Sequence, residues 1–341
     1  MPELTHRITV EGTDVSFLCQ PDDTILRAAL RAGIPFPYEC NVGACGNCKF
    51  QLLDGQVEQA WPQAPGWTDK DRERSRFLGC QARPGSDCAI KVRTSPQYAP
   101  MHLPRRVSAK LTQRHAITHD IEEFRFSLDA DMPFEPGQYA LLDLPGVPGV
   151  RAYSMSNIAD SSRSLHFQIR RVPGGIGTGV LFDQLRENTR IDIDGPYGRA
   201  YLRRDAPRDI LCIAGGSGLA PMISIARGVA SDPNLAGLKL HFLYGGRTPQ
   251  DVCGQDMLET LSGFGERIRF HAAVSNPPAD APNAWTGHSG FVHDLADALF
   301  GEKLNDMEIY FAGPPAMGTA VQQMLIARQV PFERVHFDQF Y

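Results

Sequence analysis

The stretch Cys40-Asn41-Val42-Gly43-Ala44-Cys45-Gly46-Asn47-Cys48 places three cysteines in a C-x4-C-x2-C pattern, and Cys80 follows later in the chain. This spacing predicts a 2Fe-2S cluster, whose iron takes four cysteine thiolates, because soft anionic sulfur suits such iron. The small intervening residues let the backbone wrap closely and direct amides at the sulfurs. A zinc site and a disulfide framework are the alternatives, but zinc favours paired short spacings and disulfide frameworks belong to short secreted chains. The predicted metal ligands are therefore Cys40, Cys45, Cys48 and Cys80.

Composition sets the broad class of the protein. A chain of 341 residues is too long for one ordinary core and predicts two or three domains. Hydrophobic residues make up 42% and charged residues 21%, as in folded rather than disordered proteins. A net charge of −5 argues against general nucleic-acid binding. The N-terminus has no apolar signal segment, and no run approaches the roughly 18 apolar residues of a membrane span, so we expect a cytoplasmic protein.

The first hundred residues have the pattern of a small sheet with one helix. Alternating residues at 6–10 and 15–18 predict a hairpin, and Asp22-Asp23-Thr24 offers capping oxygens to a helix that runs from Ile25 to Gly33. Further strands are expected at 49–53 and 89–92. The proline-rich stretch 61–67 and the arginine-bearing stretch 69–76 are read as core packing and a solvated helical face, with partner docking as the alternative for both.

Residues from about 5 to 95, with all four cysteines, resemble the plant-type ferredoxin domain. The resemblance implies a β-grasp 2Fe-2S domain over residues 1–95. Residues 96–106 contain three prolines and few apolar residues, which is typical of a linker.

The middle of the chain, residues 107–203, consists of short alternating segments separated by glycine and proline. This pattern predicts an antiparallel β-barrel, with its clearest strands at 124–128, 139–144 and 165–170. Within it, Arg151-Ala152-Tyr153-Ser154 places an arginine, whose planar fork pairs with phosphate oxygens, on the same strand face as a tyrosine. The serine offers a hydroxyl on the other face. This motif alone also occurs often by chance.

A second motif, Gly174-Gly175-Ile176-Gly177-Thr178, follows a strand and opens a helix. Such a turn presents free backbone amides and the positive end of the helix dipole to an anion, although it also fits an ordinary glycine loop. Together with the R-x-Y-S motif and Gly195-Pro196-Tyr197-Gly198, it resembles the flavin domain of the ferredoxin-NADP reductase family. The resemblance implies FAD, with Arg151 and the turn 174–178 on its pyrophosphate, Tyr153 against the isoalloxazine and Ser154 near N5. The implied set also includes Ala152, Gln168, Ile169, Arg170, Gly174, Gly175, Gly177 and Thr178.

The last third, residues 204–341, alternates strands and helices. The apolar run 209–214 predicts a buried parallel strand. It ends in Gly215-Gly216-Ser217-Gly218 ahead of a helix, which is the pattern of a diphosphate cradle. The alternation predicts a doubly wound parallel sheet with its ligand at the carboxyl ends of the strands. Further strands are expected at 239–244, 268–274, 308–311 and 335–337, and helices at 254–262, 291–299 and 315–329.

These segments resemble the nucleotide domain of the same reductase family. Its usual C-G-P-P turn reads Ala312-Gly313-Pro314-Pro315 here, so the chain lacks the cysteine that lies near the nicotinamide but keeps the backbone path. Arg247 is expected on the ribose or a phosphate of the nucleotide, or else in solvent. No clear basic pair follows Tyr244, which with the resemblance favours NADH over NADPH. The resemblance also implies that a C-terminal aromatic, Phe340 or else Tyr341, covers the flavin and moves aside for nicotinamide, unless this end is a strand packed only for stability.

The order ferredoxin, flavin barrel and nucleotide domain resembles the reductase component of bacterial multicomponent oxygenases, nearest to toluene and alkene or isoprene diiron monooxygenases. The resemblance implies electron flow from NADH through FAD and the cluster to a Rieske-type ferredoxin or a hydroxylase in aromatic hydrocarbon catabolism, from a reductase that is monomeric in isolation. A hydride carries two electrons and the cluster accepts one, so the flavin is needed between them. The alternatives are the reductase of a Rieske ring-hydroxylating dioxygenase or a deoxysugar dehydratase, and an iron-sulfur carrier or sensor with a degenerate nucleotide domain.

Overall fold

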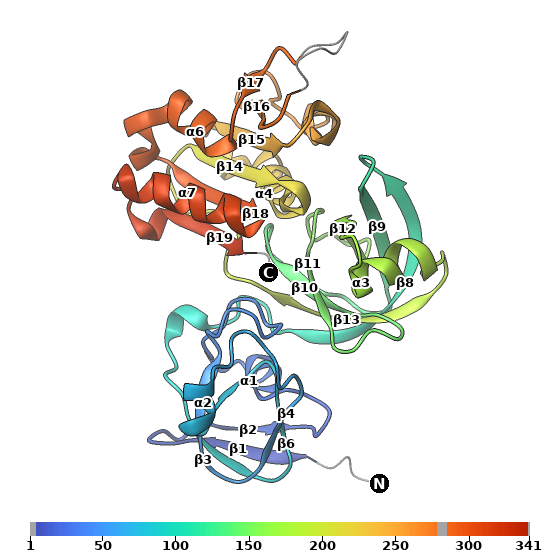
Figure 1. Cartoon of the computed structure of the whole chain (residues 1–341), viewed down its shortest axis with the longest axis vertical. Coiled ribbons are helices and arrows are strands. Elements are labelled where there is room, and N and C mark those ends of the chain that lie inside the picture. The colour runs from blue at the N-terminus through green and yellow to red at the C-terminus, as the bar shows by residue number, and fades with distance from the viewer. Residues whose placement is uncertain (1–4, 278–284, 340–341) are drawn as a thin grey trace. The chain divides into compact units, whose positions relative to one another are not determined.

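The computed structural model describes residues 5–277 and 285–339. They divide into two compact units, which Figure 1 shows in one view and which are described separately. The first unit holds the residues up to Arg106 together with Val150–Ala152 and Asp194–Tyr197, and the second holds the rest. In the described part of the chain, every helix is too short or too polar to cross a bilayer.

The first unit contains a five-stranded sheet in the order β2-β1-β7-β3-β5. β1 pairs antiparallel with β2 and parallel with β7, and α1 buries its apolar side chains from Ile25 to Leu30. The expected hairpin, the helix and the strands near residues 49 and 89 are thereby confirmed. The bounds are β1 (His6–Val10), β2 (Ser16–Cys19), α1 (Ile25–Arg31), β3 (Lys49–Asp54), β4 (Val57–Gln59), α2 (Asp69–Glu73), β5 (Arg76–Leu78), β6 (Ala82–Pro84) and β7 (Cys88–Lys91).

Two local predictions in this unit were wrong. Thr24 is the N-cap residue of α1 but makes no side-chain capping bond, and the Leu26 amide, which such a cap could satisfy, donates to Gly79 O at 3.0 Å instead. The expected helical face over 69–76 ends at Glu73, since the chain turns at Ser75 (φ 51°) into β5. The helix that does form, α2, is capped by Thr68.

The flavin-like region forms a nearly closed antiparallel barrel, as predicted. Its six strands run in the order β11-β10-β13-β8-β9-β12, and a bridge between Met155 and Phe167 joins the chain after β11 to β12. Phe124, Phe126 and Phe167 are fully buried in its core. The bounds are β8 (Arg105–Ala116), β9 (Ile121–Leu128), β10 (Tyr139–Asp143), β11 (Arg151–Ser154), β12 (Ser164–Arg170), α3 (Ile176–Gly179), a one-turn π-helix (Val180–Gln184) and β13 (Arg190–Tyr197).

The last region is a parallel sheet in the order β17-β16-β15-β14-β18-β19. The strand order reverses between β14 and β18, which makes this the topological switch point. Helix α4 lies on one face of the sheet and α6 and α7 lie on the other (Figure 1). Their side chains pack into two separate cores, which confirms the doubly wound prediction. The bounds are β14 (Ile210–Gly215), α4 (Leu219–Ser231), β15 (Leu240–Gly246), α5 (Gln255–Glu259), β16 (Ile268–Val274), β17 (His288–Ser289), α6 (Val292–Phe300), β18 (Glu308–Gly313), α7 (Pro315–Ala327) and β19 (Val335–Gln339).

Candidate functional site

The four predicted cysteine ligands lie around one loop of the first unit. Cys48 and Cys80 are buried with their Sγ atoms 3.3 Å apart, and Cys40 and Cys45 are half-buried. Backbone amides point at these sulfurs, with Cys45 N 3.3 Å from Cys40 Sγ and Cys80 N 3.5 Å from Cys48 Sγ. All four thiols are free rather than joined in disulfides, which excludes the disulfide alternative for them.

Left-handed backbone shapes the cysteine loop. Gly43 has a φ of 91° and Gly46 a φ of 79°, a region that glycine adopts without strain. The segment that follows Trp61 closes over the loop, since the Gly66 amide donates to Gly43 O at 3.0 Å and a Cβ on Gly43 would lie 3.0 Å from the Trp61 ring. The proline-rich stretch therefore packs on the cluster loop, while Trp61 itself is 41% exposed, so the predicted core packing is met only in part.

The electrostatics of the cysteines fit an iron cluster. The Cys45 thiol and the backbone amides of Cys45, Val42 and Ala44 lower the pKa of Cys40 to about 5. The resulting thiolate, with burial, raises the pKa of Cys45, and Cys80 with complete burial raises that of Cys48. For all four residues to ionise this close together, positive charge is needed among them, and ferric ions would supply it.

The residues predicted at the flavin lie mainly in two segments, strand β11 and the glycine turn 174–178. Ser154 is buried at the end of β11, Tyr153 is half-buried, and Arg151 donates to Val150 O at 3.2 Å. Arg151 and Ala152 are grouped with the first unit, so they are described apart from the glycine turn.

In that turn, Gly174 has a φ of 70°, and Thr178 Oγ1 accepts from Val172 N at 3.2 Å and lies 3.3 Å from Gly175 O. The hydroxyl of Thr178 thus holds the turn that leads into α3. The first amides of α3 have no partner within the helix, as an anion site requires.

Gln168 and Ile169 turn their side chains into the second unit. Gln168 Nε2 donates to Glu123 Oε2 at 3.1 Å and lies 3.2 Å from Met257 Sδ, and Ile169 is in the barrel core. The side chain of Ile169 therefore packs in the barrel core. The Gln168 side chain is engaged only through its Nε2, since its Oε1 is buried without a partner among the described residues.

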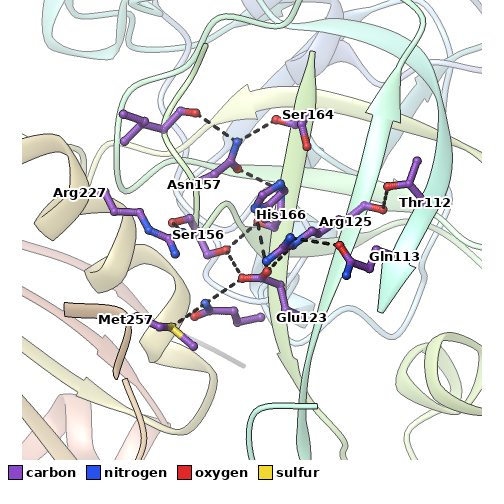
Figure 2. A network of polar contacts seen from close by, with 12 residues as sticks. Thr112, Gln113, Glu123, Arg125, Ser156, Asn157, Ser164, His166, Arg227 and Met257 are labelled. Carbon is purple, nitrogen blue, oxygen red and sulfur yellow. Dashed lines mark hydrogen bonds and ion pairs between the residues drawn. The ribbon is translucent and has the colours of Figure 1, made fainter. Parts of the chain in front are cut away.

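Glu123 is the centre of a polar network that the sequence did not reveal (Figure 2). Its carboxylate is 3% exposed and accepts from Arg125 Nε at 2.6 Å and Ser156 Oγ at 3.4 Å. Burial opposes its ionisation, but the hydrogen bonds from Arg125 and Gln168 and the charge of Arg125 leave its pKa lowered. Arg227 of α4 donates to Ser156 O at 2.7 Å, so the network joins the barrel to the helix that follows the glycine cradle.

The predicted nucleotide cradle lies at the switch point. Gly215 ends β14 and Gly313 ends the neighbouring β18. A Cβ on Gly218 would lie 1.9 Å from the backbone Ala312 O, so only glycine fits there, whereas one on Gly215 would lie 2.7 Å from Met317 Sδ and would require that side chain to move. Met317, which was not predicted, brings a sulfur to the cradle, whereas Ala312 is fully buried.

Two arginines were predicted among the cofactor-binding residues, Arg170 and Arg247. Arg170 Nη1 is 3.4 Å from the Cβ position of Gly216, and its Nε is 2.6 Å from Asp120. The end of β12 therefore brings it to the nucleotide cradle. The Arg247 residue is exposed, and its backbone amide donates to Asp251 at 3.2 Å. Phe340 and Tyr341 lie outside the described residues.

These features define a flavin- and cluster-containing pyridine-nucleotide oxidoreductase. Family models match as a 2Fe-2S iron-sulfur cluster binding domain over residues 8–85, an oxidoreductase FAD-binding domain over 108–201 and an oxidoreductase NAD-binding domain over 212–323. The chain belongs to the reductase components of multicomponent oxygenases.

Relatives match along the whole chain. The ferredoxin--NAD(P)(+) reductase CarAd of Metapseudomonas resinovorans is 36% identical over 345 residues, covering 98% of this chain and 100% of the relative. The ferredoxin--NAD(+) reductase component of the alkene monooxygenase system of Xanthobacter autotrophicus is 38% identical over 328 residues, covering 95% and 98%. The solved ferredoxin reductase in carbazole 1,9a-dioxygenase superposes with a TM-score of 0.90 at 35% identity, covering 99% of each chain. The three family models thus confirm the predicted cofactors, which are NAD, FAD and a 2Fe-2S cluster.

Proposed function

We propose that this chain is the reductase of a diiron hydrocarbon monooxygenase, and that it delivers electrons from NADH to a Rieske-type ferredoxin or directly to the hydroxylase. The observation that carries the proposal is the 38% identity, over 95% of the chain, with the alkene monooxygenase reductase component. Relatives named for phenol and for xylene/toluene monooxygenases, at 31% and 32% identity, support the same assignment. We further propose that the reductase is a monomer in isolation, which sedimentation of the holoprotein tests.

The residues divide the work of electron transfer between sites. FAD, when bound, supplies the chemistry that accepts an electron pair from NADH and releases electrons singly. We assign the glycine turn 215–218 to the dinucleotide diphosphate, because the first amides of α4 have no partner within the helix. The thioether of Met317 limits the space above Gly215. Arg151, Tyr153 and Ser154 are assigned to the flavin, and the cysteine loop holds the iron.

A preference for NADH is part of the proposal. The loop after β15 carries Asp251, whose Oδ2 accepts from the amides of Arg247 and Thr248. Burial opposes its ionisation, but the hydrogen bonds from Thr248 and the charge of Arg170 leave its pKa lowered, so it is negative at neutral pH. A fixed carboxylate in this loop repels a ribose phosphate. Measured kcat/KM should favour NADH over NADPH, and equal values would refute the assignment.

The reductase of a Rieske ring-hydroxylating dioxygenase is the second candidate, because the structure superposes so well on the carbazole dioxygenase component. The two are separated by reconstitution with NADH and purified ferredoxins from an alkene monooxygenase system and from a ring-hydroxylating dioxygenase. We expect kcat/KM for ferredoxin reduction at least tenfold higher with the monooxygenase ferredoxin. The opposite order would assign the chain to the dioxygenase.

A further inference from the structure

Helix α1 reaches the cysteine loop through one buried arginine. Arg27 is 8% exposed, and its Nε donates to Asn41 Oδ1 at 3.2 Å while its Nη2 donates to Asn41 O at 3.2 Å. Both residues belong to the first unit. A guanidinium has only donors, so the side-chain atom of Asn41 that faces it must be the oxygen. The Arg27 fork therefore determines which way the carboxamide of Asn41 is turned.

Asn41 directly follows the cluster ligand Cys40 and is 1% exposed, with a left-handed φ of 55°. Its Nδ2 is buried and has no hydrogen-bond acceptor among the described residues. Leaving such a donor unpaired is unfavourable, so an acceptor from outside the polypeptide is expected. The acceptors that belong in this loop and that the polypeptide does not supply are the sulfides of the cluster.

We propose that the Asn41 carboxamide N–H donates a hydrogen bond to a sulfur of the 2Fe-2S cluster, and that Arg27 is the positioning residue that turns it there. Hydrogen bonds to cluster sulfurs stabilise the more negative reduced state and raise the reduction potential. The backbone amides that surround Cys40 already act in this way, and Asn41 adds a side-chain donor to them. The Arg27–Asn41 pair thereby makes the cluster a better acceptor of electrons from the flavin.

The test measures the reduction potential of the cluster in the anaerobic holoprotein by a redox titration followed by electron paramagnetic resonance. Asn41→Gly removes the donor without straining a left-handed backbone position. Asn41→Asp keeps the shape and the partner for Arg27 but replaces the donor by an acceptor. Arg27→Met keeps the apolar stem and frees the carboxamide. Thr24→Val is the matched control, because Thr24 also has a buried polar atom without a partner in this unit but is not in the loop.

We expect Asn41→Gly to shift the reduction equilibrium about tenfold toward the oxidised cluster, which is 59 mV for a one-electron couple. Asn41→Asp should shift it in the same direction, Arg27→Met by less, and Thr24→Val not at all. The Arg27 and Asn41 changes combined should shift the potential no further than Asn41→Gly alone. If Asn41→Gly fails to incorporate the cluster, Asn41→Asp decides the question.

A fully loaded Asn41→Asp protein with the potential of the unmodified protein would overturn the proposal, and so would a Thr24→Val protein shifted as strongly as the Asn41 variants. A second readout is the hyperfine coupling of the reduced cluster to an 15N-labelled asparagine side chain, which should be present in the unmodified protein and lost in Asn41→Gly. Absence of any cluster signal in the unmodified protein would contradict the electron-transfer function itself, a result distinguishable from a failure of Asn41.

Discussion

Glu123→Gln tests how much of the second unit's stability depends on the buried carboxylate network. The substitution keeps the shape of the side chain but removes the charge that Arg125 Nε meets at 2.6 Å and that Gln168 meets at 3.1 Å. A hydrogen bond to a charged group contributes about 1.5–3 kcal/mol. A loss of about 2 kcal/mol corresponds to about 4–8 °C in Tm for a unit of this size. A chain of several domains need not unfold in one step. The Tm of this unit is therefore read from the rise in flavin fluorescence as FAD is released on unfolding.

Asp131→Asn provides a matched control for this prediction. Arg163 Nε meets Asp131 at 2.6 Å, the same atoms and distance as at Glu123, but the Asp131 side chain is 71% exposed. Exposed pairs contribute little, so Tm should move by less than about 2 °C. If Glu123→Gln lowers Tm no more than Asp131→Asn does, burial is not what makes the network matter, and the reasoning fails.

The pH dependence of the same pair of proteins gives a second check. Because the pKa of Glu123 is lowered in the folded state, its contribution to stability is present above the pKa of an unfolded glutamate, about 4.3. It is lost as the pH falls through the folded pKa. The Glu123→Gln protein should therefore lose less stability than the unmodified protein over this acidic range.

Three further predictions concern the electron path and the nucleotide region. Cys45→Ser should leave NADH-driven dye reduction at the flavin largely intact while abolishing cytochrome c reduction; loss of both activities would contradict the division of labour. Gly218→Ala should reduce NADH-driven dye reduction at least tenfold, because its Cβ would lie 1.9 Å from the Ala312 carbonyl oxygen, and retention of full activity would show that the cradle adapts. Burial lowers the pKa of His241 and of His271, so both favour the neutral form. Stability should fall as the pH drops below about 6.5, and His271→Phe should reduce that loss in acid melts.

Local patterns predicted the parts of this protein that depend on neighbours in sequence. The cysteine spacing located the cluster loop, because Cys40, Cys45 and Cys48 are close along the chain. The run into Gly215 located the cradle at the switch point, because a buried parallel strand and a glycine turn have adjacent signals. By contrast, β17 was not predicted, because a strand of two residues is too short to show a periodic pattern.

Features that depend on distant pairs were missed or misplaced. Arg227 and Ser156 are 71 residues apart, so no local pattern connects them. The position of Arg170 beside Gly216 depends on how β12 packs beside the nucleotide sheet, which no local pattern indicates. Thr24 is of a residue type that caps helices, yet the Leu26 amide that it could satisfy donates to Gly79 O, which is distant in sequence.

The sulfur at the nucleotide cradle is the thioether of Met317, because position 312 carries alanine in place of the cysteine of the family's turn. Met317 is not a nucleophile at neutral pH and oxidises to a sulfoxide, which methionine sulfoxide reductases repair. The remaining thiols of the second unit offer little alternative, since burial raises the pKa of Cys253 to about 11 and Cys212 is fully buried. Oxidation of the sulfur at the nucleotide cradle therefore gives a product that the cell can reduce again.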